Sequence, residues 1–284
     1  MKKFQDTKEQ ADYIAGEFAE LMETLKNGEA IALPRTWGYE IETPEADKVY
    51  QNTTPADREL IEFHQDGSVS SGDGCECDCS SCQYHDCDCH NCEEQNTDPQ
   101  HDCGSSWCCG NYQEIVSVGG LGTTKPEALE RLEELGIRGC EITDDCGLHI
   151  HIASADLSPL QVSRVLTAWR LLADILDPLA GAHRKRNRYC ADHTPEDEAL
   201  VRKGEASERY LTWNTQSHFR PKFGRPQTLE LRKHEGTNDP DRVRAWAYLA
   251  VSMVEFAKSN RPTYWLTKCE TLAEALGELG RVRA

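Results

Sequence analysis

Three segments that lie far apart in the sequence alternate polar and apolar side chains with a period of two. They are Gly-Tyr-Glu-Ile-Glu at 38–42, Leu-His-Ile-His-Ile at 148–152 and Leu-Glu-Leu-Arg at 229–232. Successive side chains of a β-strand point to opposite faces, so each segment would place its charged or imidazole groups on one face and its apolar groups on the other. Strands of one sheet would then gather six polar side chains on one side, namely Glu40, Glu42, His149, His151, Glu230 and Arg232. This arrangement predicts the floor of an active site, whereas separate half-exposed strands would show the same alternation without any site.

The remaining regular structure is expected to mix helices and strands. Further strands are expected over 59–65, 112–118, 140–153, 210–215 and 227–233. An amphipathic N-terminal helix is expected to begin at 6–7. Further helices are expected to begin at 124–127, 158–159 and 239–240, and one more after 269. Because these elements do not alternate as strand, helix and strand, the sequence favours the α+β class.

Composition limits the partners and the location that the chain can have. The formal net charge of −18 opposes attraction to a phosphate backbone, so we expect no nucleic-acid partner. The N-terminal stretch lacks the apolar run of a signal peptide, and no segment approaches the ~18 apolar residues of a membrane span. We therefore expect a cytoplasmic protein without a membrane partner.

Residues 72–110 differ sharply in composition from the rest of the chain. They hold ten of the 14 cysteines, and two copies of a short repeat end in C-x-x-C at Cys79/Cys82 and Cys89/Cys92. This spacing is typical of structural zinc, and metal binding would supply folding energy to a segment with few apolar side chains. An iron–sulfur cluster and disulfides or redox sensing remain the alternatives. The candidate zinc ligands are Cys75, Cys77, Cys79, Cys82, Cys87, Cys89, Cys92, Cys103, Cys108 and Cys109.

The polar face of the three alternating segments suits a divalent cation and a phosphate group. Carboxylates are the ligands of magnesium, and a histidine ligand also admits manganese. Arg232 offers the planar, bidentate contacts that suit phosphate. A cluster of basic residues at 184–188 would either bind phosphate or form a solvated cap at the end of the preceding helix. No P-loop motif is present in the sequence.

The order of these motifs resembles the amidoligase family, which is related to glutamine synthetase and glutamate–cysteine ligase. The resemblance covers about residues 36–240 outside the cysteine-rich segment. It is carried, in order, by Gly38-x-Glu40-x-Glu42, Asp66-Gly67-Ser68, Glu114 within Gln-Glu-Ile-Val-Ser, Cys146-Gly147-x-His149-x-His151, an arginine-rich segment and Glu230-x-Arg232.

The resemblance implies a fold and a set of roles. The fold is a curved, largely antiparallel sheet of glutamine synthetase-like type with helices on one face, which binds ATP with magnesium or manganese. The metal ligands would be Glu40, Glu42, Glu114, His149 and Glu230. His151 would support them beside the cofactor, and Arg232 with Arg186 or Arg188 would hold phosphate. Asp66 and Ser68 lie at a turn that either meets the amine or nucleotide or simply closes a hairpin, and Asp66 and Glu114 are candidates for the catalytic base.

The sequence thus predicts a catalytic domain formed by residues 1–71 and 111–284, interrupted by a zinc-binding insertion at 72–110. The predicted activity is ATP-dependent joining of a carboxylate to an amine through an acyl phosphate. The partners would be small-molecule, amino-acid or peptide substrates, and the resemblance is compatible with a homo-oligomer. Two alternatives remain: a metal-dependent hydrolase, because histidines and carboxylates also bind catalytic zinc, and a zinc-stabilised interaction protein on an inactive ligase scaffold.

Overall fold

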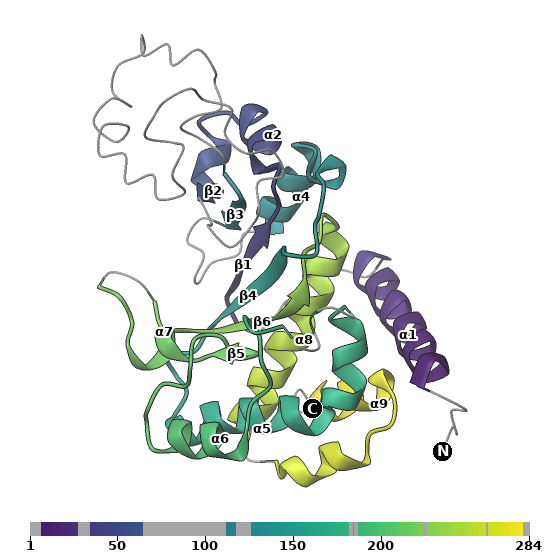
Figure 1. Cartoon of the computed structure of the whole chain (residues 1–284), viewed down its shortest axis with the longest axis vertical. Helices are drawn as coiled ribbons and strands as arrows, with labels where there is room; N and C mark the ends of the chain where they lie inside the picture. Colours follow the sequence, from purple (N-terminus) through teal and green to yellow (C-terminus); the bar gives the residue numbers. More distant parts are fainter. Residues whose placement is uncertain are drawn as a thin grey trace.

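The computed structural model describes residues 7–27, 35–64, 112–117, 126–181, 184, 187–223, 226–259 and 261–280. Within these residues, helices pack against an antiparallel sheet whose strands come from distant parts of the sequence (Figure 1). The fold therefore belongs to the predicted α+β class.

The sheet has six strands in the order β2-β3-β1-β4-β6-β5, and each neighbouring pair is antiparallel. Strands β1 and β4 occupy its centre, so both are hydrogen-bonded on both edges. The strands are β1 (Trp37–Glu42), β2 (Ile61–His64), β3 (Glu114–Ser117), β4 (Gly147–Ala153), β5 (Trp213–Asn214) and β6 (Thr228–Glu235).

Strands β2 and β3 each begin two residues later than predicted, and two other predicted strands are much shorter than the sequence suggested. The predicted strand from residue 140 begins only at Gly147, because the chain turns at Asp144 and Asp145, whose carboxylates are solvent-exposed. The predicted strand at 210–215 narrows to Trp213–Asn214. Leu211 instead forms an isolated parallel bridge with Ala191, so the segment before β5 leaves the antiparallel ladder.

The helices agree with the sequence signals wherever those signals lie in described residues. The predicted helices are α1 (Thr7–Asn27), α4 (Pro126–Glu134), α5 (Pro159–Leu176), α8 (Pro240–Lys258) and α9 (Leu272–Gly280). Short elements were not predicted: α2 (Ala46–Gln51), α6 (Pro195–Arg202), α7 (Gln216–Phe219), and the 3-10 turns η1 (Asp57–Glu59), η2 (Ile137–Gly139), η3 (Asp177–Leu179) and η5 (Thr263–Lys268).

Side-chain caps fix the starts of the two long helices that support the sheet. The Ser158 hydroxyl accepts a hydrogen bond from the Gln161 amide, and the Ser158 amide donates one to Gln161 Oε1, which forms a capping box ahead of α5. Asp239 caps α8 by accepting a hydrogen bond from Asp241. Both helices therefore begin where the sequence placed them. The predicted cap at Thr124 lies outside the described residues.

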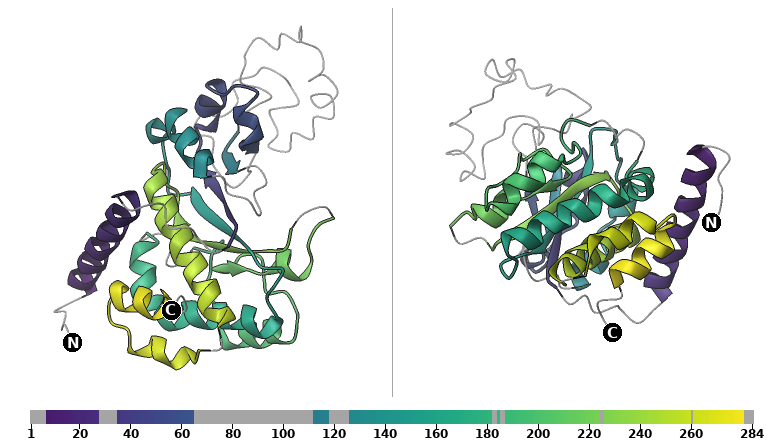
Figure 2. Two further views of the ribbon diagram at one scale, coloured as in Figure 1. Left: turned by 180° about the vertical axis from the view of Figure 1, so that it is seen from behind. Right: turned by 90° about the horizontal axis from the view of Figure 1, so that it is seen from below.

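The main core lies between the sheet and the helices on its apolar side. Helix α8 packs on β4 and β1, and both α5 and α1 pack on α8 (Figure 2). The rings of Trp169 and Trp246 stack 6.1 Å apart at the α5–α8 contact, and Phe18 of α1 lies 6.1 Å from Trp246. Tyr39 and Ile41 of β1 are buried in the same core. The apolar face of the alternating pattern is thus the one the helices cover, which leaves the polar face for a site.

A register shift between β4 and β6 gives the end of β6 an unusual arrangement. Leu148 pairs with His234, whereas Ile150 pairs with Leu231, so β6 carries one extra residue in this interval. The extra residue reverses the alternation beyond Arg232, and the His234 ring meets Trp246 in the core at 4.7 Å. In the described part of the chain, none of the helices combines the length and apolar character needed to cross a bilayer.

Candidate active site

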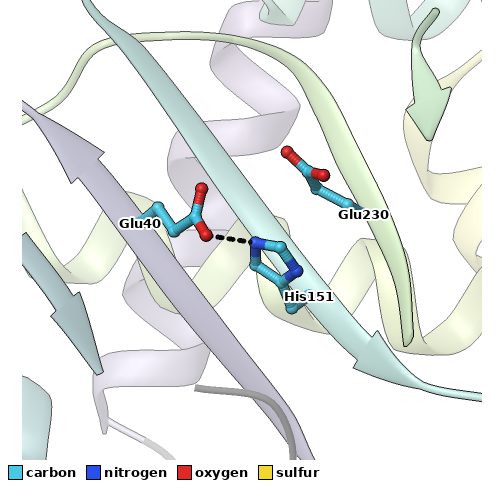
Figure 3. A group of neighbouring side chains, drawn as sticks. All are labelled: Glu40, His151 and Glu230. Atoms are coloured by element: carbon cyan, nitrogen blue, oxygen red, sulfur yellow. Dashed lines mark ion pairs between the residues drawn. The ribbon is translucent and has the colours of Figure 1, made fainter. Parts of the chain in front are cut away.

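The polar faces of four strands converge on one area of the sheet. Glu40 pairs with His149 across β1 and β4, Glu42 pairs with Glu114 across β1 and β3, and His151 pairs with Glu230 across β4 and β6. Figure 3 shows Glu40, His151 and Glu230 on three adjacent strands, with their polar ends directed towards one another. The face predicted from three separate segments is therefore one continuous surface.

Two groups on this surface have the composition and spacing of cation sites. Glu40, His151 and Glu230 form one group, and Glu40, Glu114 and His149 form the other. Within each group, the potential ligand atoms lie within 4.8 Å of one another. Because Glu40 belongs to both, its two oxygens can serve two cations at once.

The contacts around Glu40 are short and partly buried. Its Oε2 lies 3.0 Å from His149 Nδ1, and its Oε1 lies 2.8 Å from His151 Nε2. Burial acts to raise the pKa of Glu40, but the imidazoles of His151 and His149 outweigh burial, so this pKa lies well below its ordinary value. Burial acts to lower the pKa of His151, yet Glu40 and then Glu230 raise it to about 9.

The residues present fit a bound cation. His151 is only 6% exposed, and while its Nε2 lies 2.8 Å from Glu40, its Nδ1 has no hydrogen-bond partner among the described residues. An orphaned buried nitrogen beside two carboxylates is what a metal ligand would leave in a metal-free protein. The mixed oxygen and nitrogen donors suit manganese or magnesium, and a cation bound to His151 would displace its proton.

Glu230 is fixed by partners on both of its oxygens. Asn214 of β5 donates to Oε2 at 2.7 Å, and Arg232 donates to Oε1. Burial acts to raise the pKa of Glu230, but Arg232 and His151 lower it below its ordinary value. Glu230 is therefore held as an oriented carboxylate.

Glu42 is oriented by the backbone at the start of β4. Its Oε2 accepts a hydrogen bond from the Gly147 amide. A Cβ atom at residue 147 would lie 3.0 Å from Arg184 Nη2, 3.1 Å from Glu42 Oε2 and 3.2 Å from His149 Nε2. Only glycine leaves these three side chains in their present positions, since such contacts are tighter than ordinary van der Waals contact.

These groups line a cavity of about 200 Å³. Its lining combines carboxylates and a histidine with arginine and tyrosine side chains. The lining residues are Glu40, Glu42, Glu114, Asp145, His149, Arg184, Tyr189, Arg209, Tyr210 and Arg232. Such a lining can hold an anionic ligand through cations bound to the carboxylates and through the guanidinium groups.

Arg184 is the deepest cation of this lining. It is 2% exposed, its Nη2 donates to the Arg232 carbonyl at 2.8 Å, and its Nε has no hydrogen-bond partner among the described residues. A buried guanidinium with an unsatisfied donor at a cavity wall is suited to an anionic ligand, because leaving that donor unpaired is costly.

The structure brings together most of the predicted site and leaves some of it untested. Glu40, Glu42, Glu114, His149 and Arg232 line the cavity. His151 and Glu230 do not line it, but they lie beside Glu40 on the same face of the sheet. Arg188 is exposed outside the lining, with its guanidinium over the Tyr189 ring. Outside the described residues lie Asp66, Ser68, Arg186 and every predicted zinc ligand.

Several lining residues were not predicted from the sequence. Arg184 belongs to the basic stretch already noted, so its charge was a usable signal, but only the fold shows that it faces inwards. Asp145, Tyr189, Arg209 and Tyr210 lie in turns and irregular segments, where periodicity gives no direction for a side chain. Asn214 alternates with Trp213 in a strand too short to show a pattern.

The sequence of the chain matches the model of a known protein family. Residues 123–254 match the family model described as "Putative amidoligase enzyme". The match confirms the predicted resemblance to this family, and it contains β4, β5, β6 and the segment with Arg184. Strands β1 and β3, with Glu40, Glu42 and Glu114, lie outside the matched residues. No curated protein and no solved structure matches the chain.

Proposed function

We propose that this chain is an ATP-dependent carboxylate–amine ligase, an amidoligase that forms an amide or peptide bond through an acyl phosphate. The observation that carries the proposal is the convergence on one face of the sheet of two carboxylate–imidazole groups sharing Glu40, beside a cavity whose lining includes the buried guanidinium of Arg184. The match of residues 123–254 to the amidoligase family supports it. The six-stranded antiparallel sheet supports assignment to the glutamine synthetase-like type.

Amide formation in water requires activation, because a carboxylate is a poor electrophile. In the proposed reaction, a carboxylate oxygen attacks the γ-phosphorus of ATP, ADP leaves, and an acyl phosphate forms. The amine nitrogen then attacks the acyl carbon, inorganic phosphate leaves, and a base takes the proton from nitrogen. Bound Mg²⁺ or Mn²⁺ would neutralise the charge on phosphate oxygens during the transfer.

The chain's own residues would position and neutralise the reactants. Glu40, Glu42, Glu114, His149 and Glu230 would hold the cations, with His151 in support. The Arg184 guanidinium would bind the transferred phosphoryl group, and Arg232, oriented by Glu230, would contact phosphate from the adjoining wall. Glu114 lines the cavity and is the described candidate for the proton acceptor.

The assay that tests the proposal follows ADP release. The purified protein is incubated with ATP, Mg²⁺ or Mn²⁺, and pools of amino acids and short peptides. We expect ADP only when both a carboxylate and an amine are present, together with a product whose mass corresponds to loss of water from the pair. Glu40→Gln should abolish this release, while Glu59→Gln, an exposed residue outside the cavity lining, should not.

The other outcomes identify the alternative functions. Cleavage of an added amide or ester without ATP would favour a metal-dependent hydrolase over a ligase. A protein that binds neither nucleotide nor cation, and is inert with every pool, would point to an interaction protein on an inactive scaffold. Either result would overturn the ligase proposal.

A further inference from the structure

One side of the cavity ends in a cluster of arginine and tyrosine side chains, which we call the rim. The rim consists of Arg188, Tyr189, Arg209 and Tyr210. Tyr189 and Tyr210 meet edge to face with centroids 5.4 Å apart, and Tyr210 is 44% exposed. The rim therefore lies where the cavity meets solvent.

The two arginines of the rim play different parts. Arg188 donates from Nη2 to the Tyr189 hydroxyl at 2.6 Å and lies 4.7 Å over the same ring. Because the Tyr189 oxygen accepts this hydrogen bond, its own hydrogen remains for donation to another group. Arg209 lies 5.6 Å over the Tyr210 ring, and none of the described carboxylates lies within ion-pair distance of Arg209.

Arg209 differs in its surroundings from the other two arginines that line the cavity. Arg232 is engaged by the buried Glu230 carboxylate, and Arg184 lies deep in the wall. Arg209 is instead exposed at the mouth and still belongs to the lining. A cation at this position meets the part of a ligand that extends out of the cavity.

The size of the cavity indicates that part of a bound ligand would extend beyond it. Ligand pockets usually have volumes of about 300–1,000 Å³, whereas this one has about 200 Å³. A nucleotide triphosphate and an organic substrate would not both fit within it. The body of the substrate would therefore pass the rim, where an arginine fork and a phenolic hydroxyl offer donors and Tyr210 offers a flat apolar surface.

We propose that the rim binds an acidic side chain of a peptide substrate, with Arg209 and the Tyr189 hydroxyl as donors and Tyr210 as the packing surface. This inference rests on the proposed function for its reacting end, but the rim can be tested by binding alone. The chain carries a net charge of −18 and repels acidic peptides in general, so a preference for them would require this local cation.

The test compares two peptides of equal length, one with acidic side chains and one with neutral side chains. Triglutamate and triglutamine are titrated into the full-length protein by calorimetry, with Mg²⁺ and a non-hydrolysable ATP analogue present. We expect triglutamate to bind at least about ten-fold more tightly than triglutamine at low salt, as one charge-assisted contact would give. Arg209→Ala should remove the difference, and Arg209→Lys should keep only part of it because the planar fork is lost.

Matched controls separate the rim from general charge and from folding. Arg202→Ala removes an exposed arginine of α6 that does not line the cavity, and it should leave the peptide preference unchanged. The thermal unfolding midpoint of each variant checks the fold, and Arg209→Gln replaces Arg209→Ala if the latter does not fold.

Three results would overturn the rim proposal. They are equal binding of the two peptides by the wild-type protein, a preference that survives in Arg209→Ala, and a loss of nucleotide-analogue binding in Arg209→Ala with peptide binding intact. The last would assign Arg209 to the nucleotide phosphates. Because none of these readouts requires turnover, an absence of ligase activity with an intact peptide preference would count against the proposed function alone.

Discussion

Glu40 Oε2 and His149 Nδ1 lie 3.0 Å apart in directly paired positions of β1 and β4. The other Glu40 oxygen contacts His151, two residues further along the same neighbouring strand. One carboxylate thus connects two imidazoles, and this connection makes the two candidate cation groups a single unit.

Replacing Glu40 should therefore affect both groups at once. Glu40→Gln keeps the shape but removes the charge that two cations would share, so we expect Mn²⁺ affinity to fall at least about ten-fold. Electron paramagnetic resonance of free Mn²⁺ during titration measures this change. Glu59→Gln is the matched control on the exposed turn η1. Mn²⁺ binding that is equal in both variants would show that Glu40 is not a ligand.

The buried guanidinium of Arg184 leads to an unusual pair of expectations. Arg184→Met removes a buried charge with an unpaired Nε, and it also removes the hydrogen bond from Nη2 to the Arg232 carbonyl. These effects oppose each other, so the thermal midpoint should change little. The affinity for a non-hydrolysable ATP analogue with Mg²⁺ should nevertheless fall at least about ten-fold, because the anion loses a charged donor. Fluorescence titration with a labelled analogue measures the affinity, and Arg220→Met on an exposed segment serves as the control. Unchanged affinity with reduced stability would assign Arg184 a structural role.

Acid should destabilise the protein through His193. This residue is 5% exposed, and its Nε2 accepts a hydrogen bond from the Trp213 amide at 2.8 Å. Burial lowers the pKa of His193 to about 4, and the carboxylates of Asp197, Glu198 and Asp192 oppose burial without offsetting it. Between about pH 6.5 and pH 4 the unfolded chain takes up a proton that the folded chain does not, so stability falls as pH falls.

The size of this effect can be isolated with a neutral replacement. A single proton contributes at most about 1.4 kcal/mol per pH unit over that window. His193→Gln retains an acceptor for the amide but does not titrate, so its stability should depend less steeply on pH. Urea unfolding of both proteins at pH 7, 6 and 5 gives the comparison. Parallel curves would show that His193 is not the titrating group.

The cysteine-rich stretch at 72–110 lies outside the described residues, and zinc binding there stays a prediction from sequence. Ten cysteines suffice for two tetrahedral sites, so we expect about two zinc ions per chain in protein purified under reducing conditions. Cys79→Ser combined with Cys82→Ser should lower the zinc content measured by mass spectrometry, whereas Cys269→Ser should not. Iron with sulfide, or no metal at all, would contradict the zinc prediction.

The sequence predicted the floor of the site well because strand alternation is a local rule. Glu40, His149 and Glu230 each face the direction that their neighbours dictate, and the helices cover the apolar side. The caps at Ser158 and Asp239 were also readable, since a cap depends on residues within one helical turn.

The walls of the site could not be predicted in the same way. Arg184 and Tyr210 lie in segments without regular periodicity, so their orientation depends on contacts with distant parts of the chain. The extra residue in β6 was hidden as well. It reverses the alternation after Arg232 and turns His234 into the core, which a two-residue period does not predict.

A substitution at Gly147 should affect activity without affecting the stability of the fold. Gly147→Ala would place a Cβ atom 3.0–3.2 Å from the ends of Arg184, Glu42 and His149. These are side-chain tips that can move by a few tenths of an ångström, so the fold should persist and the thermal midpoint should change little. Displacing the oriented groups should still lower ATP-dependent turnover at least about ten-fold, because positioning errors of this kind are costly in catalysis. Gly139→Ala is the matched control, since a Cβ at that glycine meets no atom within 4 Å and it ends the neighbouring turn η2. Equal turnover in the two variants would mean that the close packing at Gly147 plays no part in the reaction.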